Sequence, residues 1–182
     1  MAQERARIVT DPLGRTKRRT DLSAIHQAGD PETLLRRRDE ALGRIRVTRE
    51  EIVAETAGLD GERAHAGDRW SVMHVLWHLA GRDSHLDEAR RIVDEGVTEL
   101  APDPRPDDEL RENVGRVLAT IDEVVAFCET LTPEQLAVHA RRANRDYYVI
   151  GMIESMGEHL QDHLDHIRQI KESLAAGGPV PA

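Results

Sequence analysis

Four long segments of this chain place apolar residues every three or four positions, the spacing of one face of an α-helix. The first starts with Asp30 as N-cap and Pro31 in the first helical position, and it ends near Gly58. The other three segments cover about residues 68–96, 107–131 and 148–175. No segment shows the alternation expected of a strand. The pattern therefore predicts an all-α fold, with four helices packed as a bundle.

Composition agrees with a helical bundle. The chain has 182 residues, 39% of them hydrophobic and only 3% aromatic. A core with so few aromatic residues must consist of Leu, Val, Ile, Met and Ala, which pack helix against helix. This length is enough for one domain with a sizeable core and hardly enough for two, so one domain is expected.

The connection between the second and third helices carries topological information. It reads VTELAPDPRPDDE and contains Pro102, Pro104 and Pro106, which favour an extended chain. At roughly 3.3 Å per residue, its dozen residues reach along a helix of about 25 residues. Helices two and three can therefore run parallel. This predicts an up-down-down-up bundle with a long crossover between helices 2 and 3.

Residues 1–30 differ from the rest of the chain. They carry a basic cluster without a helical apolar period, formed by Arg15, Lys17, Arg18 and Arg19. The sequence thus predicts a basic N-terminal arm at 1–30, the bundle at 31–176 and a C-terminal tail at 177–182. Such an arm can touch nucleic acid, or it can fold over an acidic surface of its own chain or of a partner, and the second interpretation is favoured.

Charge and cysteine content narrow the functional classes. The net charge of −9 argues against nucleic acid as a partner of the body, because phosphate binding needs a clustered positive face. The single cysteine, Cys128, lies among apolar residues, which favours a buried thiol over a nucleophile. No apolar run has the length of a signal peptide or membrane span. We therefore expect a cytoplasmic protein that does not enter the membrane.

The last predicted helix contains three histidines, in the stretch GEHLQDHLDHIRQI. With about 100° of turn per residue and His159 at zero, His163 falls near 40° and Ile167 near 80°. Both histidines then lie inside the apolar stripe. His166 falls near −20° and Asp162 near −60°, toward the polar side. The helix is therefore predicted to direct the pair His159 and His163 inward.

The second predicted helix offers a partner for this pair. The same count places His78 at the margin of its apolar stripe, with His74 and His85 turned further out. One inward histidine on helix two can thus meet the inward pair on helix four, which is how bundles assemble metal sites. Three neutral imidazoles with an open fourth position suit zinc, and their ligand type also suits nickel, iron or manganese. The alternative is that nine histidines produce such pairs by chance and are only hydrogen-bonded.

The stretch RWSVMHVLWHLAGRD, followed much later by EHLQDHLDHI, resembles the DinB/YfiT-like family of metal-dependent enzymes. Members start a helix with Trp-Ser, carry His-Leu downstream and have a late His-x-x-x-His. The similarity covers about Thr33–Leu174. It implies an up-down-down-up four-helix bundle, frequent homodimers and a divalent metal, usually zinc or nickel. It also implies the ligands His78, His159 and His163.

Other residues of the two motifs surround this ligand set. His166 stands where relatives often have histidine or glutamine, which suits a role beside the ligands. Asp162 with His166 is also an i, i+4 pair and offers a shifted acid-plus-histidine register. With His74 and Glu158 they are candidates to orient a ligand or to carry a proton. For each of the four, a role as a solvated helix-surface residue is favoured over catalysis.

A metal held this way opens two kinds of chemistry. It can lower the pKa of bound water to about 7, or it can hold a thiol as thiolate. The family resemblance points the same two ways, since relatives include hydrolases and transferases that use small thiols such as bacillithiol or mycothiol. The prediction is a metal-dependent hydrolase or thiol-dependent transferase acting on a small molecule. The alternative is a non-catalytic dimeric binding or stress-response module, with a structural metal or none.

Overall fold

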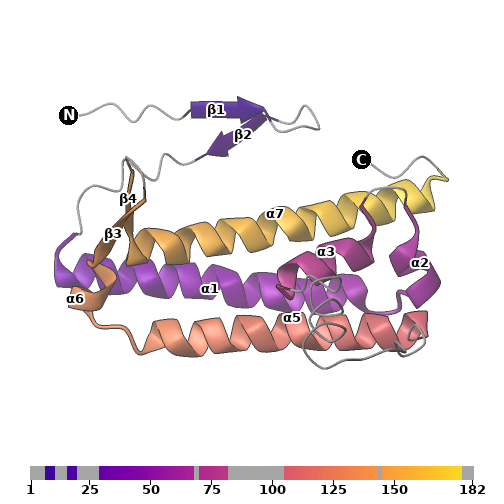
Figure 1. Ribbon diagram of the computed structural model, residues 1–182, viewed down its shortest axis with the longest axis horizontal. Helices are drawn as coiled ribbons and strands as arrows, with labels where there is room; N and C mark the ends of the chain where they lie inside the picture. The colour runs from indigo at the N-terminus through magenta and orange to yellow at the C-terminus, as the bar shows by residue number, and fades with distance from the viewer. Residues whose placement is uncertain are drawn as a thin grey trace, which may run out of the picture. The chain divides into compact units, whose positions relative to one another are not determined.

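The computed structural model describes residues 7–10, 16–19, 29–67, 70–81, 105–142 and 145–177. These residues are mostly helical, which confirms the predicted helical class. The long helices are α1 (Pro31–Thr56), α5 (Pro106–Glu129) and α7 (Val149–Ala175). Shorter helices are α2 (Gly61–His65), α3 (Val72–Leu79) and α6 (Pro133–Leu136) (Figure 1). The second half of the predicted helix two and residues 97–104 of the predicted crossover lie outside the described residues. Pro106, expected in the extended crossover, is instead the first residue of α5.

Local capping explains where these helices begin. Asp30 Oδ1 accepts a hydrogen bond from the Thr33 backbone N–H at 3.0 Å, so it caps α1 as predicted. This bond lowers the pKa of the Asp30 carboxyl. Thr132 and Gln135 form a capping box around α6, whose first residue is Pro133. The predicted bounds of the long helices differ from those observed by only one or two residues, which is the usual uncertainty at helix ends.

The prediction that no strand is present is wrong. Strands β1 (Arg7–Thr10) and β2 (Thr16–Arg19) pair antiparallel, with Arg7 opposite Arg19. Strands β3 (His139–Arg142) and β4 (Arg145–Tyr148) form a second hairpin, with His139 opposite Tyr148 and their ring centroids 5.2 Å apart. None of the four sequences, RIVT, TKRR, HARR and RDYY, alternates apolar with polar residues, so the period gave no signal.

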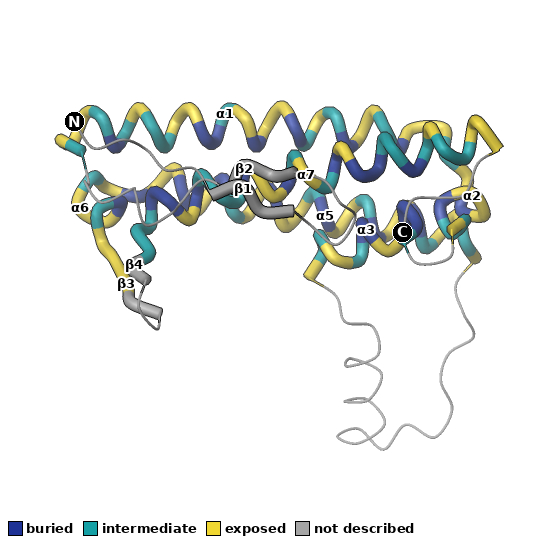
Figure 2. Tube along the Cα trace, turned by 90° about the horizontal axis from the view of Figure 1, so that it is seen from above, coloured by how far each residue is buried: buried dark blue, intermediate teal, exposed yellow. Residues whose placement is uncertain are grey.

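Contacts divide the chain into two compact units. The first unit consists of residues 1–46 and 125–159, and the second of residues 47–124 and 160–182. Helices α1, α5 and α7 each contribute to both units, since the boundaries fall inside them. Figure 2 shows that buried positions recur along each of these helices, between exposed ones. The helices are therefore amphipathic, as their sequence period predicts.

In the first unit, α1 and α7 run in the same direction. The Arg37 guanidinium donates to both carboxylate oxygens of Glu154, at 2.8 and 2.7 Å. Further along both helices, Gly157 approaches the Ile45 side chain and the Ala41 carbonyl. Cys128 belongs to the core of this unit, and burial raises the pKa of its thiol, which confirms the predicted buried thiol. Other core residues are Leu34, Ala41, Leu42, Val125, Leu131, Leu136, Ile150 and Ile153.

The same parallel pairing of α1 and α7 occurs in the second unit. Thr48 donates a hydrogen bond to Gln161. Further toward the C-terminal ends of both helices, Glu55 accepts hydrogen bonds from Arg168 and Lys171. These bonds lower the pKa of the Glu55 carboxyl. The unit buries an aliphatic core that includes Ile52, Val72, Val75, Leu76, Val117, Leu164, Ile167 and Ile170.

Helix α5 runs against α1 in the second unit. Arg49 on α1 binds Asp122, whereas Gly61, beyond the end of α1, donates its N–H to Asp107 near the start of α5. Helix α3 runs against α7, because Trp70 just before α3 lies beside His166, and His78 near its end lies beside the earlier His163. None of the described helices combines the length and the apolar character needed to cross a lipid bilayer.

Candidate metal centre

Helix α3 begins at a serine cap that contacts the first histidine of the helix. Ser71 is fully buried, and its Oγ accepts a hydrogen bond from the His74 backbone N–H at 3.2 Å. The same Oγ lies 2.8 Å from His74 Nδ1. His78 follows one turn later at the end of the helix. The apolar residues between the histidines, Val75 and Leu76, are buried and hold this helix on the core of the second unit.

The structure brings together the three predicted ligands, His78 of α3 with His159 and His163 of α7. Each offers one nitrogen, and these nitrogens all lie within 4.8 Å of one another. The rings of His78 and His163 have centroids 4.7 Å apart and planes inclined at 53°. His159 and His163 are one turn apart on the same helix. All three imidazoles are therefore positioned by two helices, α3 and α7, and none of them is on a loop.

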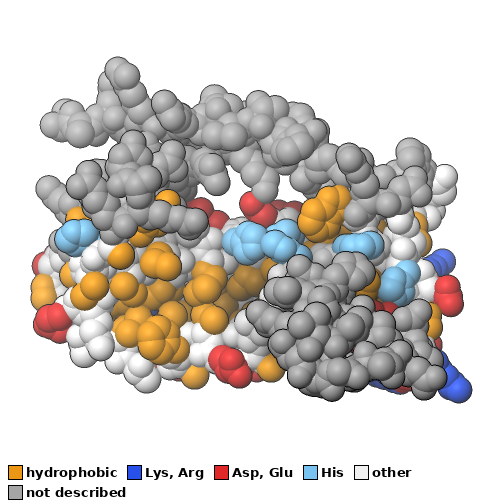
Figure 3. All heavy atoms as spheres, viewed as in Figure 1, with side chains coloured by type: hydrophobic (Ala, Val, Ile, Leu, Met, Phe, Trp, Pro, Cys, Tyr) orange, Lys and Arg blue, Asp and Glu red, His pale blue; other side chains and the backbone are white. Residues whose placement is uncertain are grey.

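The three side chains differ in exposure. His78 and His159 are exposed, and His163 is half-buried. Figure 3 shows histidine side chains gathered at the surface of one face of the molecule, next to apolar side chains. A ligand at this cluster would thus be anchored on its inner side and approachable from solvent.

The donor set fits a divalent metal. Three nitrogens bound to one tetrahedral zinc at about 2.0–2.1 Å lie roughly 3.3 Å apart. The observed limit of 4.8 Å therefore requires the nitrogens to close by at most about 1.5 Å, which side-chain rotation supplies. Three imidazoles leave a fourth tetrahedral position for water or another small ligand. The same ligands also accept nickel, iron or manganese.

The predicted burial of the histidines on α7 is wrong in two places. His159, expected inside the apolar stripe, is exposed, and His166, expected toward the polar side, is only 7% exposed. The reason is that the buried stripe is centred on Leu160, Leu164 and Ile167, so that His159 falls at its edge. His166 is buried because the Trp70 ring packs against it, with centroids 5.5 Å apart.

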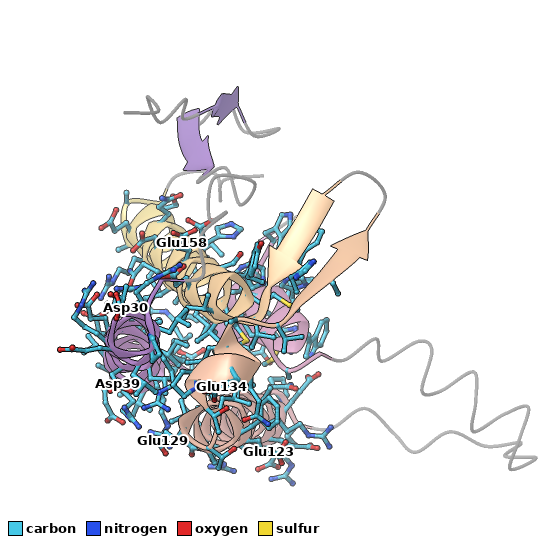
Figure 4. All side chains as sticks on the ribbon, turned by 90° about the vertical axis from the view of Figure 1, so that its left-hand side faces the viewer. Asp30, Asp39, Glu123, Glu129, Glu134 and Glu158 are labelled. Carbon is cyan, nitrogen blue, oxygen red and sulfur yellow. The ribbon has the colours of Figure 1, made fainter. Side chains whose placement is uncertain are left out.

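The remaining candidates lie in different surroundings. His74 is exposed and contacts the Trp77 ring edge-on at 4.9 Å. Glu158 is exposed on α7 (Figure 4), and Asp162 is exposed as well. Among the described residues, the group that can hold a metal includes neither Asp162 nor His166, so the shifted register gains no support from the structure. His85 lies outside the described residues.

One neighbour of the cluster was not recognised as such from the sequence. The Trp70 ring lies 6.5 Å from His78 and 5.5 Å from His166. Its position directly before the capping residue Ser71 was the available signal, because it places the ring at the start of the helix that carries His78. A second histidine contact, His65 Nε2 to Glu109 Oε2 at 2.9 Å, was missed with helix α2.

Comparisons with known proteins identified no relative. No family model matches the chain, and neither a curated protein nor a solved structure is similar enough to count as a match. The resemblance to the DinB/YfiT-like family therefore stays a prediction from the two sequence motifs.

Proposed function

We propose that the protein is a metal-dependent enzyme of the DinB/YfiT-like type, with a divalent metal held by His78, His159 and His163. The observation that carries this proposal is the approach of the three ligand nitrogens to within 4.8 Å of one another. Zinc is the metal we put first, because three neutral imidazoles and an open position suit it. Nickel, iron and manganese are the alternatives.

We also propose that the long helices form the up-down-down-up bundle. The contacts that support it are directional. Helix α7 runs with α1 in each unit, α5 runs against α1, and α3 runs against α7. Two helices pointing one way and two the other agree with this order.

The proposed reaction is hydrolysis or the transfer of a small thiol. When bound, a divalent metal would lower the pKa of a water or thiol ligand and so supply a nucleophile near neutral pH. His163, half-buried, would hold the metal from the inner side, and the exposed His78 and His159 would hold it at the solvent side. Because two of the three ligands are exposed, a substrate would approach the metal from solvent.

The test separates an open site from a closed one. In cobalt-substituted protein, addition of azide or a small thiol such as 2-mercaptoethanol is expected to change the visible spectrum, because either can occupy an open position. The matched control is His78→Ala protein treated with the same cobalt and ligands, which should lose most of the parent spectrum. An unchanged parent spectrum, with four protein ligands in X-ray absorption, would support the non-catalytic module with a structural metal.

Assembly is the second part of the proposal. We propose a homodimer that does not depend on Cys128, since the thiol is buried in its own chain. Large apolar side chains remain exposed at Phe127, Val138 and Met152 of the first unit, and a partner surface would cover such residues. Light scattering at micromolar concentration should give about twice the 20.4 kDa of one chain, also for Cys128→Ser. A mass near one chain would contradict the dimer.

A further inference from the structure

The Trp70 side chain connects the histidine cluster to the protein behind it. Its ring lies edge-on to His78 at 6.5 Å and tilted against His166 at 5.5 Å. Trp70 itself is half-buried, whereas His166 is 7% exposed. The indole is therefore packed against His166 and lies next to a proposed metal ligand, in a residue that is not fully buried.

The second tryptophan has a different environment and serves as a comparison. Trp77 is also half-buried, and its ring contacts His74 at 4.9 Å and His65 at 5.9 Å. His65 in turn binds Glu109. Trp77 therefore belongs to the contacts between α2, α3 and α5. The two tryptophans of the chain therefore have different histidine neighbours, His78 and His166 for Trp70, and His65 and His74 for Trp77.

We propose that Trp70 is a substrate-binding wall, and that the site selects substrates in which a flat aromatic group adjoins the metal-binding group. This inference rests on the proposed metal site at His78, His159 and His163. A ligand on a metal held by His78 would lie beside His78, whose ring centroid is 6.5 Å from that of Trp70, so an extended ligand would reach the indole. The exposed part of an indole binds flat aromatic groups by offset stacking or by edge contact.

The energetic reason is general. A tryptophan left partly in water loses apolar burial that a bound aromatic group would restore. An aromatic pair contributes beyond its area burial, and the combined gain corresponds to an affinity difference of about tenfold. A small aliphatic ligand on the same metal would not reach this wall and would gain little. The site should therefore separate aromatic from aliphatic ligands that share one metal-binding group.

Two hydroxamates provide the probe, because benzohydroxamic acid and acetohydroxamic acid chelate zinc through the same atoms and differ in the aromatic ring. Calorimetry on the zinc-loaded full chain should show that benzohydroxamate binds about tenfold more tightly. The Trp70→Leu variant should lose most of this preference, whereas Trp70→Phe should keep much of it because phenylalanine retains an aromatic face. The matched control Trp77→Leu should keep the full preference.

A spectroscopic readout guards against a variant that does not fold. In the Trp77→Phe protein, Trp70 is the only tryptophan, and its fluorescence should change when benzohydroxamate binds and much less with acetohydroxamate. Equal affinity of both hydroxamates for the zinc-loaded parent would overturn the aromatic wall and leave the metal site standing. Absence of zinc binding by the parent would overturn the proposed function and this inference with it.

Discussion

Replacing His163 with alanine is expected to lower zinc affinity by about 100-fold or more. Changes in residues that only orient metal ligands cost roughly 10–100-fold, so removal of a ligand should cost at least the upper part of that range. His163 is the most enclosed of the three, and its ring lies 4.7 Å from that of His78. Competition with a coloured zinc chelator, on protein without a histidine tag, measures the affinity directly.

The neighbouring histidines supply the controls for this measurement. His78→Ala and His159→Ala should also lose zinc, because they remove nitrogens of the same group. Variants of histidines outside the group, namely His74→Ala, His85→Ala and His139→Ala, should retain zinc. If His163→Ala bound zinc like the parent while Asp162→Ala or His166→Ala did not, the shifted register would be the correct one.

Acidity should weaken zinc binding in the parent. Protons and zinc compete for the same imidazole nitrogens, and metal binding releases protons. The affinity measured with the chelator should therefore fall as the pH is lowered.

The sequence could predict the long helices because their start and stop signals are local. Asp30 accepts its hydrogen bond from a residue three positions away, and α7 ends at Ala175, as predicted. The pairing of His159 and His163 is local as well, since helix geometry alone places them one turn apart. Such features need no knowledge of the tertiary structure.

Burial on α7 could not be predicted in the same way, because it depends on a distant residue. The angular count placed His166 on the polar side, and the Trp70 ring, far away in the sequence, buries it. The short strands and α2 were missed because four or five residues carry too little periodicity. The approach of His78 to the histidine pair on α7 involves distant residues, yet it could be predicted. Periodicity and resemblance predicted it, and the structure places the three nitrogens together.

Truncation of a core residue beside the histidines is expected to cause a large loss of stability. Ile167 is fully buried and follows His163 by one turn of α7. Ile167→Ala removes three buried carbon atoms and leaves a cavity, so the free energy of unfolding should fall by about 2–5 kcal/mol. Urea denaturation of metal-free protein measures this change. Val47→Ala on α1 is the control, because Val47 is 60% exposed and should change stability by only about 0.5 kcal/mol.

The gain in stability from zinc should then differ between a core variant and a ligand variant. A metal that binds only the folded chain adds about 2.7 kcal/mol at a free concentration of 100 Kd. Provided that Ile167→Ala still folds, zinc should restore much of its lost stability, since all three imidazoles remain. His163→Ala should show the opposite pattern, with a small loss in metal-free stability and little gain from zinc. Equal gains from zinc in the parent and in His163→Ala would contradict the proposed ligand set.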